Sequence, residues 1–158
     1  MNAVIIGVGS LKEDWQRQGC GEYLKRLSRY GRYEIAEVPD EPEPAKPSEA
    51  LNAAVMEKEG KGILKLIKPT DFVVALCIEG KGVSSTELAE LTGRWETGGK
   101  RVVFVIGGSL GLSREVTNRA DFKLSFSKMT FPHPLMRVIL LEQLYRAARI
   151  NAGERYHK

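Results

Sequence analysis

Five short segments rich in β-branched and aromatic residues alternate along the chain with stretches of helical spacing. They cover residues 3–8, 33–38, 72–78, 102–106 and 122–126. Such alternation predicts an α/β fold, with βαβ units around a mostly parallel sheet flanked by helices. The third and fourth segments are continuously apolar, as expected for strands that are covered on both faces.

Helices are predicted in two of the intervening stretches. Residues 13–28 carry apolar side chains near helical spacing, although Gly19 and Gly21 would each weaken a helix by about 1 kcal/mol relative to alanine. Ser84 and Glu87 have the spacing of a capping box, and a glycine pair later supplies the stop for that helix.

A last helix is expected after Pro132 and Pro134, running to about residue 152. It contains the apolar run 138–141. Four consecutive apolar residues at about 100° each cover most of the helix circumference, so one buried stripe cannot hide them all. Either this helix lies deep in the monomer or a second chain covers its outer face. We favour the second chain and therefore expect a homodimer.

The whole chain, residues 1–158, is expected to form a single domain. Residues 39–48 contain four prolines, which remove backbone donors and fix φ, so they predict an exposed loop. A domain boundary there is not expected, because the 38 preceding residues are too few for a core of their own.

Nothing in the sequence suggests a membrane protein or a secreted one. No apolar stretch approaches the ~20 residues of a membrane span, and the N-terminal segment has neither the basic leader nor the cleavage pattern of a signal peptide. Cys20 and Cys77 stand alone, which suits reduced thiols better than a disulfide framework. We therefore expect a cytoplasmic protein with no membrane partner.

Charge is distributed unevenly along the chain. Residues 1–93 carry 12 Lys/Arg and 15 Asp/Glu, a net charge of −3, whereas residues 94–158 carry 12 and 5, a net charge of +7. A basic half can attract a phosphate backbone, but an ordinary solvated surface would have the same composition.

Three glycine-rich stretches follow predicted strands. The stretch at residues 7–9 lacks the third glycine of a dinucleotide fingerprint, because Lys12 stands at that position. Residues 79–82 and 107–111 lack the spacing of a nucleotide-hydrolase phosphate loop. Loops at the carboxyl ends of parallel strands often bind ligands, so the stretch 107–111 fits a binding loop as well as a tight turn.

Metal and nucleophilic catalysis find little support. The only histidines, His133 and His157, do not have paired-ligand spacing, so no metal is expected. Ser109 does not stand in a nucleophile-elbow motif.

The stretch 125–134 has an unusual composition, because hydroxyl side chains, aromatic rings and two prolines lead from a strand into a helix. This composition suits an adenine-like ring, and equally a capped helix entry.

Several long motifs resemble one known family. They are FVIGGS at 104–109, SKMTFPH at 127–133, MRV at 136–138, EQLYRA at 142–147 and YHK at 156–158. These motifs, and matches over essentially the whole chain, are similar to the small RlmH-type 23S rRNA (pseudouridine-N3)-methyltransferases of the SPOUT superfamily. The resemblance implies a SPOUT-type α/β knot, in which the C-terminal segment makes a deep trefoil knot, and a homodimer built on the terminal helix.

The resemblance also implies a cofactor, a substrate and site residues. The methyl donor would be S-adenosyl-L-methionine, and the substrate a pseudouridine in helix 69 of 23S rRNA within the ribosome, methylated at N3; no DNA partner is expected. The residues that match the donor site form the following set: Leu76, Gly107, Phe126, Ser127, Lys128, Met129, Thr130 and Phe131.

Residues for chemistry and RNA contact follow from the same stretches. We hypothesise that Arg146, His157 and His133 lie near the target base, where they would accept a proton or stabilise an anion. Arg146 is also placed for a structural i,i+4 pair with Glu142. The positively charged side chains of Arg137 and Lys158 would suit contact with the phosphate groups of the RNA.

Two other functions remain open at this point. One is a SPOUT methyltransferase that acts on a different RNA nucleoside. The other is a ribosome-associated binding protein that keeps the fold without catalysis.

Overall fold

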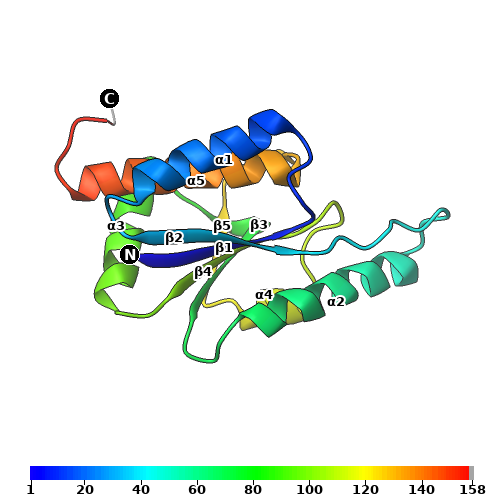
Figure 1. Cartoon of the computed structure of the whole chain (residues 1–158). Helices are drawn as coiled ribbons and strands as arrows, with labels where there is room; N and C mark the ends of the chain where they lie inside the picture. Colours follow the sequence, from blue (N-terminus) through cyan, green and yellow to red (C-terminus); the bar gives the residue numbers. More distant parts are fainter. Residues whose placement is uncertain (157–158) are drawn as a thin grey trace.

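The computed structural model describes residues 1–156, and its centre is a five-stranded sheet (Figure 1). Every strand pairing is parallel, and the strand order is β2-β1-β4-β3-β5. The strands are β1 (Asn2–Val8), β2 (Arg32–Val38), β3 (Phe72–Gly82), β4 (Val102–Ile106) and β5 (Phe122–Ser125). The prediction of an α/β fold with a mostly parallel sheet is therefore confirmed.

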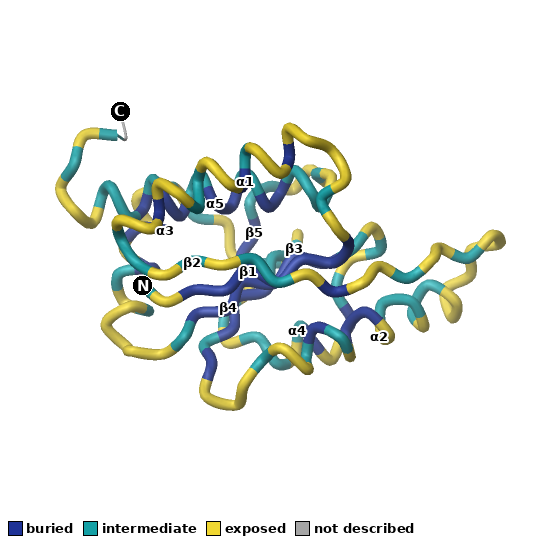
Figure 2. The backbone as a smooth tube through the Cα atoms, in the orientation of Figure 1, coloured by how far each residue is buried: buried dark blue, intermediate teal, exposed yellow. Residues whose placement is uncertain are grey.

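Helices cover both faces of this sheet. One layer consists of α1 (Asp14–Leu27), α3 (Ser85–Thr97) and α5 (His133–Asn151), and the other of α2 (Glu49–Leu66) and α4 (Arg114–Arg119) (Figure 1). Alternate strand residues divide between two cores: Ile5 and Phe104 face the first layer, while Val4 and Val103 face the second. Figure 2 shows the resulting pattern, with the central strands buried and the outer helix surfaces exposed.

Two helices and two strand ends differ from the sequence-based expectation. Neither α2 nor α4 was predicted, because α2 contains two glycines and has a weakly segregated apolar face, and α4 has only 6 residues. Strand β3 continues to Gly82 instead of ending at residue 78, and β5 ends at Ser125.

The apolar run of α5 is covered within the chain. Leu140 and Leu141 are fully buried, and Val138 packs on α1, where a Cβ added at Gly19 would lie 3.2 Å from its Cγ1. Helices α1 and α3 both contact α5. The run therefore does not by itself require a partner chain, because the neighbouring helices of the same chain cover it.

The proline-rich loop, residues 39–48, is largely exposed, as predicted, and extends beyond the sheet (Figure 2). Its inner end is tied to the body of the molecule. The backbone N–H of Glu41 donates to Oε1 of Glu59 over 3.0 Å, and the hydroxyl of Ser109 donates to the carboxylate of Glu43. The loop is thereby joined to both α2 and the glycine-rich loop after β4.

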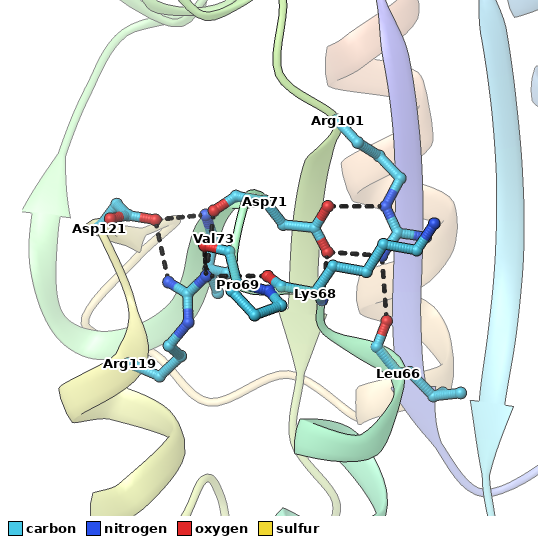
Figure 3. Close-up of polar contacts among 8 residues, drawn as sticks. All are labelled: Leu66, Lys68, Pro69, Asp71, Val73, Arg101, Arg119 and Asp121. Carbon is cyan, nitrogen blue, oxygen red and sulfur yellow. Dashed lines mark hydrogen bonds and ion pairs between the residues drawn. The ribbon is translucent and has the colours of Figure 1, made fainter.

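A polar network lies at the amino ends of β3 and β4 (Figure 3). The guanidinium of Arg101 donates to both carboxylate oxygens of Asp71, whose side chain is almost fully buried. Arg119 donates to the carbonyls of Lys68, Pro69 and Asp71 over 3.1–3.5 Å. Burial opposes ionisation of Asp71, but the hydrogen bonds from Arg101 outweigh it, and the pKa of Asp71 lies below its ordinary value.

Within residues 1–156, none of the helices has the length and apolar character needed to cross a membrane.

Candidate functional site

A cavity of about 870 Å³ lies at the carboxyl ends of β3, β4 and β5. Three segments form its walls: the end of β3 at residues 76–79, the glycine-rich loop with its continuation at 106–112, and the connection between β5 and α5. The carboxyl edge of a parallel sheet is where open α/β folds bind their ligands. The volume falls within the range of about 300–1,000 Å³ that is typical of small-molecule sites.

The glycine-rich loop can be this tight only because it lacks side chains. A Cβ at Gly107 would lie 2.7 Å from the carbonyl carbon of Gly111, and Gly111 itself has a φ of 90°. A Cβ at Gly108 would lie 2.9 Å from Oε2 of Glu59. The loop therefore presents backbone N–H and C=O groups to the cavity at close range, which suits the edge of a heterocyclic ring.

Strand β3 forms the second wall through a large irregularity. Leu76 and Lys81 both pair with Leu124 of β5, so the residues between them bulge out of the ladder. Cys77, Ile78 and Glu79 of this bulge line the cavity. Burial, and then the charge of Glu79, raise the pKa of the Cys77 thiol, which favours its protonated form.

The connection from β5 to α5 forms the third wall. Phe126, Ser127, Met129, Thr130 and Phe131 all line the cavity, whereas Lys128 is exposed and does not. The hydroxyl of Ser127 accepts the backbone N–H of Met129 over 3.0 Å, which holds the turn. The structure thus brings seven of the eight predicted donor-site residues to one cavity, because Leu76 and Gly107 line it from the other two walls.

Comparison with known proteins places this architecture in a family. A family model described as "Predicted SPOUT methyltransferase" matches residues 1–157. The chain belongs to the SPOUT methyltransferase family. It is 57% identical, over the full length of both chains, to proteins of Clostridium novyi (strain NT) and Bacillus thuringiensis (strain Al Hakam) that are named "Ribosomal RNA large subunit methyltransferase H".

A solved structure gives the same fold at low sequence identity. It is described as "The structure of a probable methylase family protein from Haemophilus influenzae Rd KW20", and it is similar to this SPOUT chain with a TM-score of 0.56 at 12% identity. The match covers 99% of this chain and 70% of the other.

Of the predicted catalytic residues within 1–156, His133 lines the cavity of this SPOUT domain and Arg146 does not. His133 is the first residue of α5, and its buried Nδ1 has no hydrogen-bond partner among the described residues. Burial, and then the charge of Arg137, lower the pKa of His133. The imidazole is therefore neutral at physiological pH and can accept a proton.

The prediction that Arg137 contacts phosphate is wrong. Its side chain is fully buried, and its Nη2 donates to the carbonyls of Val8 and Gly9. Its Nη1 donates to Oε1 of Glu37 over 2.8 Å. A guanidinium held by three protein acceptors beneath the surface has a structural role.

Arg146 does not line the cavity and stands in the C-terminal half of α5. Its Nη2 donates to Oε1 of Glu142 over 2.6 Å, and its guanidinium carbon lies 4.7 Å from the ring centroid of Tyr156. The i,i+4 pair with Glu142 is therefore formed. The other two predicted residues, His157 and Lys158, lie outside the described residues.

Sequence reasoning missed several wall residues. The sequence predicts that the third strand ends at residue 78 and therefore misses the bulge of β3, and Thr117 comes from α4, for which the sequence predicts no helix. A repeat of glycines at residues 80 and 82 was the available signal for an irregular strand end. In the part of the chain described here, no group of three or more His, Cys, Asp or Glu side chains could hold a metal ion.

Proposed function

We propose that this chain is an S-adenosylmethionine-dependent methyltransferase of large-subunit ribosomal RNA, acting on N3 of a pseudouridine in helix 69 of 23S rRNA. The observation that carries the proposal is that a full-length relative at 57% identity is named as a large-subunit rRNA methyltransferase. The cavity supports it, because seven of the eight residues that match the donor site line it.

The cavity fits the methyl donor in size and chemistry. Apolar side chains such as Leu76 and Phe126 exclude water from a ring, while the loop around Gly107 offers backbone groups to a ring edge. Ser127 and Thr130 add hydroxyl groups for the polar part of the donor. When bound, S-adenosylmethionine supplies an electrophilic methyl group on its sulfonium.

The protein contributes chiefly by positioning. Holding the acceptor nitrogen in line with the methyl group is worth roughly 7 kcal/mol or more in favourable cases. N3 must also lose its proton. We assign this step to His133, whose neutral imidazole lies at the cavity, and it would contribute about 10²–10⁴-fold as a general base. Arg146, which does not line the cavity, and His157 are proposed to act on the RNA.

The proposed partners are 23S rRNA in the ribosome and a second copy of the chain. The basic C-terminal half of the sequence suits RNA contact, and Lys128 is exposed beside the cavity. Trp15, 52% exposed on α1, suits a protein interface near α5. With Arg137 committed to the interior, Lys158 remains as the proposed phosphate contact. The site of action would be the cytoplasm, where ribosomes are.

We also propose the deep trefoil knot that the resemblance implies. The segment 126–134 passes beside the glycine-rich loop on its way into α5, and both line the same cavity. A C-terminal segment threaded through a loop would bring those two parts together in this way.

The decisive experiment is methylation of ribosomes with a labelled donor. Ribosomes that contain the helix 69 pseudouridines should become labelled at N3, and ribosomes from cells without the pseudouridine synthase should not. Label in another nucleoside would instead indicate a different RNA target. A protein that neither binds the donor nor transfers label to the ribosome would be a noncatalytic ribosome-associated module.

A further inference from the structure

Glu79 is the only carboxylate among the residues that line the cavity in the described part of the chain. The other ionisable wall residues are Cys77 and His133. The pKa of the thiol is raised by burial and the pKa of the imidazole is lowered by burial, so both are uncharged near neutral pH. Among these wall residues Glu79 therefore supplies the one carboxylate, while the carboxylates of Glu43 and Glu59 stand behind Ser109 and Gly108 of the glycine-rich loop.

The bulge of β3 places this carboxylate. Strand β3 leaves its register with β5 after Leu76 and resumes it at Lys81. Between them, Gly80 lies directly against β5, because an added Cβ would stand 2.7 Å from the carbonyl carbon of Leu124. Bulges commonly re-aim side chains at functional sites. Glu79 is thus held at the wall by two paired strand segments and not by a free loop.

No cation neutralises Glu79 within residues 1–156. None of the ion pairs formed in this part of the chain includes it. Its charge reaches the inner wall, because it is the second cause, after burial, that raises the pKa of the neighbouring Cys77. Lys123 of β5 acts on the same thiol in the opposite sense, but Lys123 does not line the cavity.

We propose that Glu79 is a specificity-determining residue, whose carboxylate attracts the positively charged sulfonium of the methyl donor and favours it over the neutral thioether product. This inference rests on the proposed function. Donor and product share the adenosine, the amino group and the carboxylate, and they differ in one methyl group and one positive charge. A fixed negative charge at the wall therefore discriminates between them, which promotes exchange of product for donor after each turnover.

The effect should be modest, because Glu79 is exposed. Exposed ion pairs are worth up to about a fivefold change in an equilibrium constant. We therefore expect Glu79→Gln to weaken S-adenosylmethionine binding by about three- to fivefold and to leave S-adenosylhomocysteine binding unchanged.

The experiment is calorimetric titration of the full chain with each of the two compounds. Glu79→Lys should lower the donor-to-product affinity ratio further than Glu79→Gln, and added salt should lower the ratio of the wild type. The matched control is Glu90→Gln, because Glu90 is an exposed carboxylate on α3 that does not line the cavity. It should leave both affinities unchanged.

Two results are distinguishable as failures. If Glu79→Gln leaves the donor-to-product affinity ratio unchanged, because both affinities fall equally or neither changes, the role of Glu79 is overturned while the proposed function stands. A wild-type protein that binds neither compound would overturn the proposed function, and the role of Glu79 with it.

Discussion

Arg137 and Glu37 form an ion pair in which one partner is fully buried and the other is 42% exposed, with 2.8 Å between Nη1 and Oε1. The same guanidinium donates to the carbonyls of Val8 and Gly9, where β1 ends. Gly7 makes room for it, since an added Cβ would overlap with Nε of Arg137. Arg137 therefore joins the start of α5 to the ends of β1 and β2, directly behind the cavity residue His133.

Replacing Arg137 by methionine should destabilise the protein by about 3 kcal/mol, because two buried carbonyls lose their donor. Urea unfolding followed by circular dichroism would measure the change in the free energy of unfolding. Glu37→Gln is the comparison: it keeps both carbonyls hydrogen-bonded but removes the counter-ion of a buried guanidinium, so it should cost about 1–2 kcal/mol, less than Arg137→Met. An Arg137 variant with wild-type stability and reduced RNA affinity would restore the phosphate-contact interpretation.

Gly107→Ala should weaken donor binding strongly in a folded protein. The new Cβ would meet the backbone of Gly111 at 2.7 Å, so the loop must move out of its position at the cavity wall. We expect at least a tenfold loss of affinity for S-adenosylmethionine by calorimetry. Gly21→Ala is the matched control: nothing lies within 4 Å of its added Cβ, and it should leave binding unchanged and stabilise α1 by about 0.5–1 kcal/mol. Unchanged donor affinity in Gly107→Ala would remove this loop from the site.

The sequence was informative where one local pattern determined the structure. The alternating apolar segments predicted all five strands, and the spacing of Ser84 and Glu87 predicted α3, whose capping box is present. The bulge that carries Glu79 was out of reach, because it depends on pairing with β5 some 40 residues later. Burial of Arg137 was equally hidden, because an arginine on an amphipathic helix usually faces water, and only the tertiary contact with β1 shows otherwise.

Asp71→Asn should cost about 2 kcal/mol at neutral pH, because Arg101 loses its charged acceptor in a mostly buried site. The pKa of Asp71 is lowered in the folded state, so this contribution is present above its ordinary pKa of 3.8 and is lost as the pH falls through the lowered value. Unfolding free energies of the wild type and the variant should therefore converge in acid. The control is Asp14→Asn: the side chain of Asp14 is 84% exposed in its ion pair with Arg17, so the change should alter stability by less than about 0.5 kcal/mol.

Glu59 should show the opposite pH dependence. Burial raises its pKa above the ordinary 4.5, and its Oε2 has no partner among the described residues. The folded state then holds the proton more tightly than the unfolded state, so stability falls as the pH rises from 4.5 through the raised pKa. Glu59→Gln keeps an acceptor for the N–H of Glu41 and removes the buried charge, so it should raise stability near pH 7 by about 1 kcal/mol. Urea titrations across this pH range would test it, and a variant that is less stable near pH 7 would contradict the argument.

His133→Gln should separate chemistry from donor binding. Burial and the nearby Arg137 lower the pKa of His133, so the neutral imidazole is the dominant form at and above its ordinary value of 6.5. If this imidazole takes the proton from N3, kcat should fall by about 10²–10⁴-fold while the affinity for S-adenosylmethionine stays within twofold. The acid limb of the wild-type pH–rate profile should vanish in the variant. Glu90→Gln again serves as the control, because Glu90 is exposed on α3 and does not line the cavity. A His133 variant that keeps both the wild-type kcat and the acid limb would assign proton removal to another group, because the titration seen in the acid limb would then not be that of His133.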